Sequence, residues 1–259
     1  MKVLLCSLIA FLCVVNAFAA NVSTTKEEFC SDRKDHNYFK ELLEDDNNRL
    51  SFSNRGGLLN GGVCWWHSRF QRNSIYLTMY NPDLPTPTDK EAKKIISNIR
   101  KGKKIVIIPG FDNFNDFSRK YYSLIQKELE KWQRRDGFIR QSWITGLSGN
   151  YEVSADELAN KMDNLYDYVV ENTNIAYQKL QLEGIEAHAW LVIDMKKTYN
   201  GYKLIVVDSN YLNARTHEYT YGDTYFEYGL SWKFVPYTEQ KKELKRLKKV
   251  IKKYCANVL

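Results

Sequence analysis

The chain has 259 residues, of which 44% are hydrophobic and 27% charged, and a formal net charge of +7. This length allows a sizeable core within one domain, and neither an internal repeat nor a low-complexity linker interrupts it. After the N-terminal segment, no run approaches the roughly 18 consecutive apolar residues that a membrane span requires. The positive charge favours electrostatic association with an anionic surface or cell wall, without indicating specific recognition of nucleic acid.

The first 19 residues have the pattern of a secretory signal peptide. Lys2 precedes an apolar run over residues 3–15, and Ala17-Phe18-Ala19 is an A-x-A cleavage site. We therefore expect a secreted or periplasmic protein, with residues 20–259 as a single catalytic domain. Residues 21–55 are expected to form an N-terminal helical lead-in to that domain.

Three cysteines remain after removal of the signal peptide: Cys30, Cys64 and Cys255. An odd number in an oxidising compartment suggests one disulfide and one free thiol. A disulfide between Cys30 and Cys255 would clamp the two ends of the domain and leave Cys64 reactive. A pairing that uses Cys64 would remove the free thiol, and the sequence leaves that alternative open.

Cys64 follows two glycines at the predicted start of a helix. Apolar residues recur at positions 66, 70, 77 and 80, which is helical spacing, so Cys64 falls in the first turn. A helix N-terminus stabilises an anionic thiolate, and the glycines let the backbone approach a substrate closely. Cys64 is therefore a candidate nucleophile, although a free cysteine is often simply a small buried hydrophobic residue.

The chain between Cys64 and the next candidate residues is predicted to be rich in helix. A capping box at Thr88–Glu91 begins a helix to about Arg100, residues 104–108 form a short strand, and residues 116–135 form a second helix. A further capping box at Ser154–Glu157 predicts a long helix that continues to Leu182. Neither the glycine-rich dinucleotide fingerprint nor the phosphate-loop motif occurs.

Two apolar runs on either side of Asn200-Gly201 predict a β-hairpin. His188 enters the first strand, and Asp208 and Asn210 leave the second, so these side chains lie at the same end of the hairpin. A two-residue turn at Asn200-Gly201 would place His188 and Asp208 on opposite faces, so we predict a longer loop or a β-bulge. One such register sets Asn210 opposite His188, and another sets Asp208 there.

Three segments in this order resemble the papain-like cysteine peptidases, most closely the YopT-type branch with its Cys-His-Asp triad. They are Gly-Val-Cys64 at a helix start, His188-Ala-Trp on a strand and Asp208-Ser-Asn at a strand end. The resemblance implies an α+β fold in which a helical part carrying the nucleophile packs on an antiparallel sheet carrying His and Asp. It implies Cys64 as nucleophile, His188 as base and acid, and Asp208 as orienter, with Asn210 as the alternative orienter and no cofactor.

The resemblance also implies an oxyanion hole, made from the backbone N–H of Cys64 and an upstream side-chain amide. Asn60 is the candidate, with Asn54 as the alternative. His67 shares a helix face with Cys64, and we interpret it as a packing or surface histidine because adjacent-turn pairs rarely align for proton transfer. A zinc site from Cys64, His67 and His188 would lack a fourth ligand and the usual cysteine spacing, so no metal is expected.

The predicted function is that of a secreted cysteine peptidase or amide hydrolase, which acts on a protein or peptide through a thioester acyl-enzyme. Transglutaminase-like domains share the His-Ala-Trp segment and the triad. A transglutaminase-like acyl transferase or a cell-wall amidase is therefore an alternative. From another class, the rival is a non-catalytic basic binding protein in which Cys64 is only structural.

The C-terminal part is predicted to contain strands and one helix. Residues 217–237 alternate aromatic and polar side chains, which is typical of antiparallel strands. Residues 238–259 form a lysine-rich amphipathic helix. Such a helix either docks on the domain with a solvated outer face or lies on an anionic membrane or wall, and we favour docking.

Overall fold

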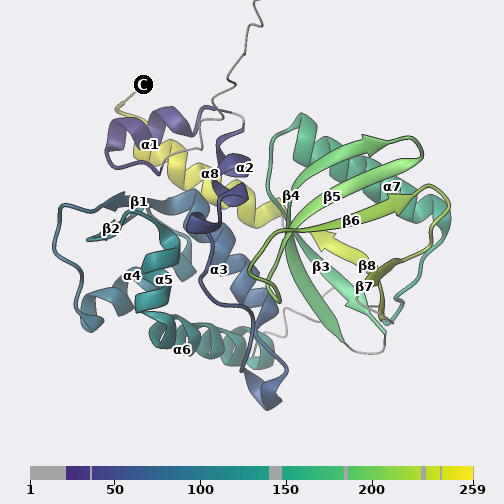
Figure 1. The fold of residues 1–259 in the computed structure, drawn as a ribbon, viewed down its shortest axis with the longest axis horizontal. Coiled ribbons are helices and arrows are strands. Elements are labelled where there is room, and N and C mark those ends of the chain that lie inside the picture. Colours follow the sequence, from purple (N-terminus) through teal and green to yellow (C-terminus); the bar gives the residue numbers. More distant parts are fainter. Residues whose placement is uncertain are drawn as a thin grey trace, which may run out of the picture.

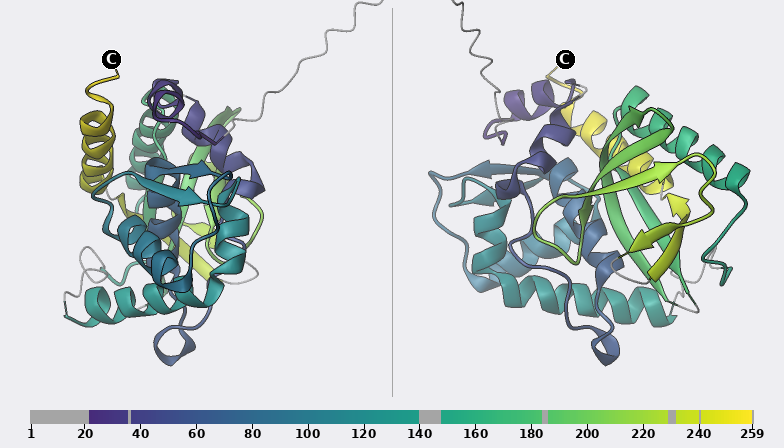
Figure 2. Two further views of the ribbon diagram at one scale, coloured as in Figure 1. Left: turned by 90° about the vertical axis from the view of Figure 1, so that its left-hand side faces the viewer. Right: turned by 45° about the vertical axis from the view of Figure 1, so that its right-hand side comes forward.

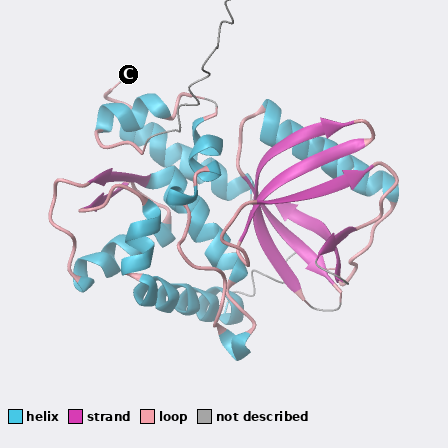
Figure 3. Cartoon of the chain, viewed as in Figure 1, coloured by secondary structure: helices cyan, strands magenta, loops and turns pink. Residues whose placement is uncertain are grey.

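The computed structural model describes residues 22–35, 37–139, 148–183, 186–228, 232–239 and 241–258. The predicted signal peptide, residues 1–19, lies outside the described residues. The structure is mixed α/β: a group of helices lies beside a strongly curved, nearly barrel-shaped antiparallel sheet (Figures 1 and 3).

The helical part is formed by the first half of the chain and one helix from its C-terminal end. A small parallel sheet, β1 (Thr78–Asn81) with β2 (Val106–Pro109), lies at its edge. Its helices are α1 (Lys26–Asp32), α2 (Tyr38–Glu44), α3 (Cys64–Leu77), α4 (Asp89–Lys101), α5 (Phe114–Lys120), α6 (Tyr122–Gln133) and α8 (Lys241–Cys255). Shorter 3₁₀ turns, η1 (Asp46–Asn48) and η2 (Leu58–Asn60), and a π-helical segment, η3 (Arg134–Ile139), join them.

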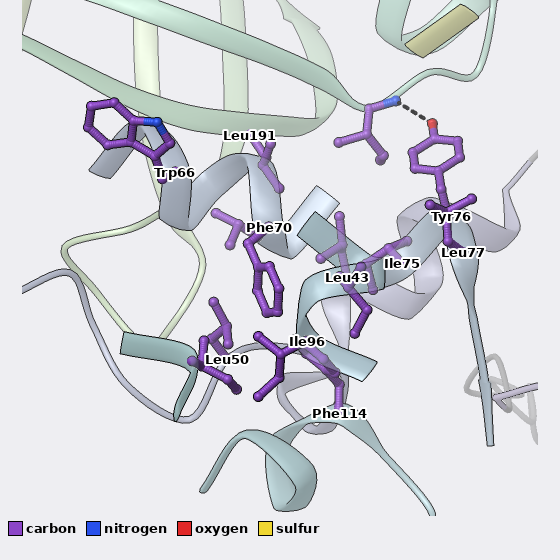
Figure 4. Close-up of a cluster of buried hydrophobic side chains, with 14 of the residues drawn as sticks. Leu43, Leu50, Trp66, Phe70, Ile75, Tyr76, Leu77, Ile96, Phe114 and Leu191 are labelled. Carbon is purple, nitrogen blue, oxygen red and sulfur yellow. Dashed lines mark hydrogen bonds between the residues drawn. The ribbon is translucent and has the colours of Figure 1, made fainter. Parts of the chain in front are cut away.

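Helix α3 lies between the sheet and other helices of the helical part, such as α4 and α5 (Figure 1). It begins at Cys64, directly after the glycine-containing segment, as predicted. Nearly every residue of α3 is buried, which is the pattern of a helix surrounded by protein. The core around it is drawn in Figure 4, where Phe70 of α3 lies among side chains from other elements, including Leu43, Leu50, Ile96, Phe114 and Leu191.

The sheet has the strand order β6-β5-β4-β3-β8-β7, and every neighbouring pair is antiparallel. Its strands are β3 (Ala176–Leu182), β4 (Ala187–Thr198), β5 (Gly201–Asp208), β6 (Arg215–Thr220), β7 (Phe226–Tyr228) and β8 (Trp232–Glu239). The sheet is preceded by α7 (Ala155–Tyr166) and the π-helical segment η4 (Asp167–Glu171). Figure 2 shows its curvature from two further directions.

The two faces of the sheet belong to two hydrophobic cores. Ala189 and Leu191 of β4 pack in the core that contains α3. Trp190 and Val192 point the other way, into a second core that includes Leu158 of α7. This alternation follows from the two-residue repeat of a strand. The sheet is thus held between α3 on one side and α7 on the other.

The predicted helix from Ser154 to Leu182 is wrong in its second half. The helical chain ends at Glu171, Thr173 adopts a left-handed conformation (φ 49°), and β3 follows. The β3 backbone pairs with β4 on one side and β8 on the other. This pairing between distant segments overrides a local sequence in which Gln, Lys and Leu are good helix formers.

Other predicted helices are shorter or more divided than expected. The helix over residues 116–135 is interrupted at Tyr121 into α5 and α6 and then becomes η3. The lead-in over residues 21–55 contains α1, α2 and the 3₁₀ turn η1, with irregular chain after them. By contrast, α4 has the complete capping box at Thr88 and ends at Gly102, which is left-handed (φ 61°).

Helix α8 docks on the helical part of the molecule, as favoured from its amphipathic pattern. Leu244 and Leu247 are buried, and Cys255 forms a disulfide with Cys30 of α1. Glu243 forms ion pairs with two arginines of α3. Within the described ranges, no helix combines the length and the hydrophobicity needed to cross a membrane.

Candidate active site

Two side chains of α3 attach the helix to β4. The Cys64 thiol donates to the carbonyl oxygen of Ala187 (Sγ···O 3.9 Å), and the Ser68 hydroxyl donates to that of Ala189 (3.0 Å). The two donors are about one helical turn apart, and the two acceptors lie two residues apart on the strand. The start of α3 is therefore held beside His188, which lies between the two carbonyl groups.

The structure brings together Cys64, His188 and Asp208. The Nε2–H of His188 donates to Oδ1 of Asp208 at 2.7 Å, and the imidazole also hydrogen-bonds the Cys64 side chain. The backbone N–H of Asn210 donates to the same Asp208 oxygen at 2.8 Å. Asp208 is fully buried, while Cys64 and His188 are 8% and 7% exposed. A thiol, an imidazole and a carboxylate thus form one continuous hydrogen-bonded chain.

A β-bulge in β4 puts His188 and Asp208 on one face. Next to the turn, Thr198 pairs with Gly201; beyond an irregularity between Val192 and Asp194, Trp190 pairs with Asp208. Without that extra residue, Trp190 would pair with Ser209, and Asp208 would face away from His188. Of the two predicted alternatives, a longer loop or a β-bulge, the structure therefore confirms the β-bulge.

The charge state of His188 depends on its two partners. Burial lowers the pKa of an imidazole, but the charge and hydrogen bond of Asp208, together with Cys64, raise the pKa of His188 to about 10. His188 is therefore protonated at neutral pH when Asp208 is ionised.

The upstream amide that contacts the nucleophile segment is Asn54. Its Oδ1 accepts the backbone N–H of Val63 (2.5 Å), and its Nδ2 donates to Oδ1 of Asn210 (3.0 Å). Asn60, the first choice for the oxyanion hole, lies in η2 with an exposed side chain and a left-handed backbone (φ 59°). The structure thus favours Asn54 over Asn60 as the upstream amide. Of the two candidate orienters, Asp208 contacts His188, whereas the side chain of Asn210 contacts Asn54.

His67 has a structural role, as its helix position suggested. Its Nε2 is 2.9 Å from the carbonyl oxygen of Phe52, to which it donates, and its ring packs edge-on against the Phe52 ring. Burial lowers the pKa of His67 to about 4, so the ring is neutral at pH 7. Because Nε2 is occupied by the backbone, His67 anchors the irregular segment before α3.

Sequence reasoning missed a buried lysine that contacts the residue after the candidate nucleophile. Lys179 of β3 is 3% exposed, and its ammonium lies 3.8 Å from the ring centroid of Trp65, the residue after Cys64. Burial lowers the pKa of Lys179 to about 8. The residue was missed because β3 was predicted as helix; the break at Asn172-Thr-Asn174 was the available signal for a strand.

The cysteine arrangement leaves the candidate nucleophile unmodified. Cys30 and Cys255 are joined as expected, and Cys64 is the one free cysteine among the described residues. Those residues contain no group of three or more His, Cys, Asp or Glu side chains placed to hold a metal ion. Comparisons of the chain with protein-family models, with curated proteins and with solved structures each found no match.

Proposed function

We propose that this protein is a cysteine hydrolase that cleaves amide bonds of peptides or proteins. The observation that carries the proposal is the position of His188, which hydrogen-bonds both the Cys64 side chain and, at 2.7 Å, Asp208. A nucleophile, a base and an orienting group in this order are the elements of covalent acyl-transfer catalysis. A helix bearing the cysteine and a sheet bearing His and Asp also support a papain-like arrangement.

In the proposed reaction, the Cys64 thiolate attacks the carbonyl carbon of a substrate amide. His188, as imidazolium, gives its proton to the leaving amine, and the carbon–nitrogen bond breaks to leave a thioester. Neutral His188 then takes a proton from water, which attacks the thioester and releases the acid and the thiol. Asp208 keeps the ring oriented and stabilises its charge throughout.

The oxyanion of each tetrahedral intermediate needs hydrogen-bond donors. The N–H groups in the first turn of a helix have no partner inside the helix, so the N–H of Cys64 is suited to this role. We assign Asn54 to positioning: its contact with Val63 and Asn210 fixes the segment that presents this N–H. Because its Nδ2 group carries a second hydrogen, Asn54 is also a better candidate than Asn60 for the side-chain donor of the oxyanion hole.

We also propose that the protein is secreted. This proposal is supported by the signal-like pattern of residues 1–19 and by the disulfide between Cys30 and Cys255, because disulfides persist mainly in oxidising compartments. The substrate class is expected to be a peptide or protein outside the cytoplasm.

The test uses the purified protein and its Cys64→Ser variant on a library of fluorogenic peptides. Wild type should hydrolyse a subset of them, and the variant should lose at least about 10³-fold in kcat/KM with an unchanged circular dichroism spectrum. Equal hydrolysis by both proteins would disprove the proposal. Incorporation of an added amine, or release of muropeptides from cell wall, would identify acyl transfer or wall-amide cleavage instead.

A further inference from the structure

A cavity of about 350 Å³ opens on the helical part of the molecule. None of the proposed triad residues lines it. Its walls come from α3, α4, η3 and α8, with Trp132 of α6. Six of its lining side chains are cationic: Arg69, Arg100, Lys101, Lys103, Arg135 and Arg246. A concentration of positive charge in a concave site is the arrangement that attracts anions.

The two inner arginines are held in place by the protein itself. Arg69 pairs with Asp136 at 2.8 Å and with Glu243, and its guanidinium lies 4.4 Å from the ring centroid of Trp132. Arg100 pairs with Glu128 at 2.5 Å. These arginines are fixed before any ligand arrives, so little side-chain entropy is lost when they bind one.

The four outer cations are not neutralised in this way. Lys101, Lys103, Arg135 and Arg246 are exposed, and none of them pairs with a carboxylate within the part of the chain that the structure describes. They come from the end of α4 and the turn after it, from η3 and from α8. Distant segments therefore converge on one opening with like charges, whose mutual repulsion an anion would relieve.

We propose that this cavity binds a compact anion that carries several phosphate groups. Guanidinium groups bind phosphate oxygens in bidentate geometry, and lysines add mobile point charges. The volume lies at the lower end of the range for small-ligand sites, about 300–1,000 Å³, so a short polyphosphate fits better than an extended polymer. The excess of cations requires several negative charges on the ligand. This binding is independent of the proposed hydrolysis.

The experiment is isothermal titration calorimetry of the purified protein with sodium tripolyphosphate and with orthophosphate at about 0.15 M salt. Tripolyphosphate should bind with one-to-one stoichiometry, and orthophosphate should bind at least about tenfold more weakly. A Lys103→Gln, Arg246→Gln double variant should weaken tripolyphosphate binding by at least about tenfold, because it removes two of the four unpaired cations.

The matched control is a Lys252→Gln, Lys253→Gln double variant. These residues are exposed on the same helix as Arg246 but outside the cavity, and the loss of net charge is the same. The control should keep the wild-type affinity within about twofold. If the Lys103→Gln, Arg246→Gln variant fails to fold by circular dichroism, Lys103→Gln alone, in an exposed turn, should still weaken binding several-fold.

Three results would overturn the proposal. The first is absence of tripolyphosphate binding. The second is an equal loss of affinity in both double variants, which would show attraction by net charge alone. The third is binding of long nucleic acid or sulfated polysaccharide without competition from tripolyphosphate.

Discussion

Trp190 and Asp208 are register partners on β4 and β5, and His188 lies two residues before Trp190 on the same side of its strand. This relation depends on the extra residue in β4 and not on the turn of the hairpin. The Trp190 indole N–H donates to Gln178 of β3 at 2.9 Å, and the ring is fully buried in the second core. The strand that carries His188 is thereby fixed from both neighbouring strands.

Gly62 provides a test of the segment before Cys64, the candidate nucleophile. Its backbone is left-handed (φ 82°), and a Cβ there would lie 2.5 Å from Nδ2 of Asn54. Gly62→Ala should lower the free energy of unfolding by about 1–3 kcal/mol and reduce any peptidase activity. Gly61→Ala is the matched control, because Gly61 has φ −73° and a Cβ would meet only Leu58 O at 3.4 Å. Denaturation in urea measures both, and equal losses would contradict the role assigned to Asn54.

The raised pKa of His188 predicts a pH dependence of stability. The folded protein holds the His188 proton more tightly than the unfolded chain does, since the pKa rises from 6.5 to about 10. The stabilisation is fully present below about pH 6.5 and is lost as the pH rises towards 10. The difference in unfolding free energy between wild type and His188→Gln should therefore shrink by several kcal/mol over this range.

His67 supplies the contrasting control for that measurement. Its pKa falls from 6.5 to about 4 on folding, so the proton favours the unfolded chain. The difference between wild type and His67→Gln should be flat above about pH 6.5 and should change only as the pH falls from there to about 4. Urea denaturation over the whole pH range separates the two histidines. A flat profile for His188→Gln would contradict its link to Asp208.

Glu243 joins α8 to α3 and should dominate the stability of that contact. Its carboxylate pairs with Arg69 and, at 2.6 Å, with Arg72, which is fully buried. Glu243→Gln leaves buried Arg72 without its carboxylate partner and Arg69 with Asp136 alone, and it should cost about 3–5 kcal/mol at pH 7. Glu218→Gln, on the exposed face of β6, should change stability by less than about 0.5 kcal/mol.

The ion pairs of Glu243 also predict a loss of stability at acid pH. Burial opposes ionisation of Glu243, but the two arginines lower its pKa from 4.5 to about 2. The stabilisation is therefore present above about pH 4.5 and is lost as the pH falls through about 2. The Glu243→Gln variant should lack this part of the acid-induced loss, and thermal melts between these pH values measure the difference.

Removal of the disulfide should lower the stability of the fold and leave the free thiol of Cys64 in place. Replacing Cys30 and Cys255 by serine should lower the unfolding free energy by about 2–5 kcal/mol, because the unfolded chain is no longer cross-linked. The folded variant without residues 1–19, which contain Cys6 and Cys13, should still take up a single equivalent of iodoacetamide, at Cys64. Intact mass spectrometry checks this, and modification of wild type at Cys30 or Cys255 without reductant would contradict the pairing.

Local signals in the sequence predicted the elements whose ends are chemically marked. The glycines before Cys64 marked the start of α3, the Thr88–Glu91 box marked α4, and the apolar runs around Asn200-Gly201 marked the β4–β5 hairpin. The convergence of Cys64 and His188 was expected from the order of three motifs, not from any single one. Each of these predictions depends on residues near one another in sequence or on a resemblance of ordered segments.

Features that depend on distant contacts were not predictable in the same way. β3 became a strand because β4 and β8 pair with it, and Lys179 is near Trp65 only as a result. The contact of Asn54 with Val63 and Asn210 required the folded path of the irregular segment between η1 and η2. The cationic cavity combines residues of α3, α4, η3 and α8, whose charges form no pattern along the chain.

A nascent chain leaving the ribosome cannot complete this sheet early. β3 and β4 are synthesised well before β8, which begins at Trp232 and covers the second edge of β3. Glu243, which secures α8 against the helix that begins with Cys64, is translated later still. The Cys64 sulfur and the His188 imidazole therefore gain their complete scaffold only after β8 and α8 have been synthesised.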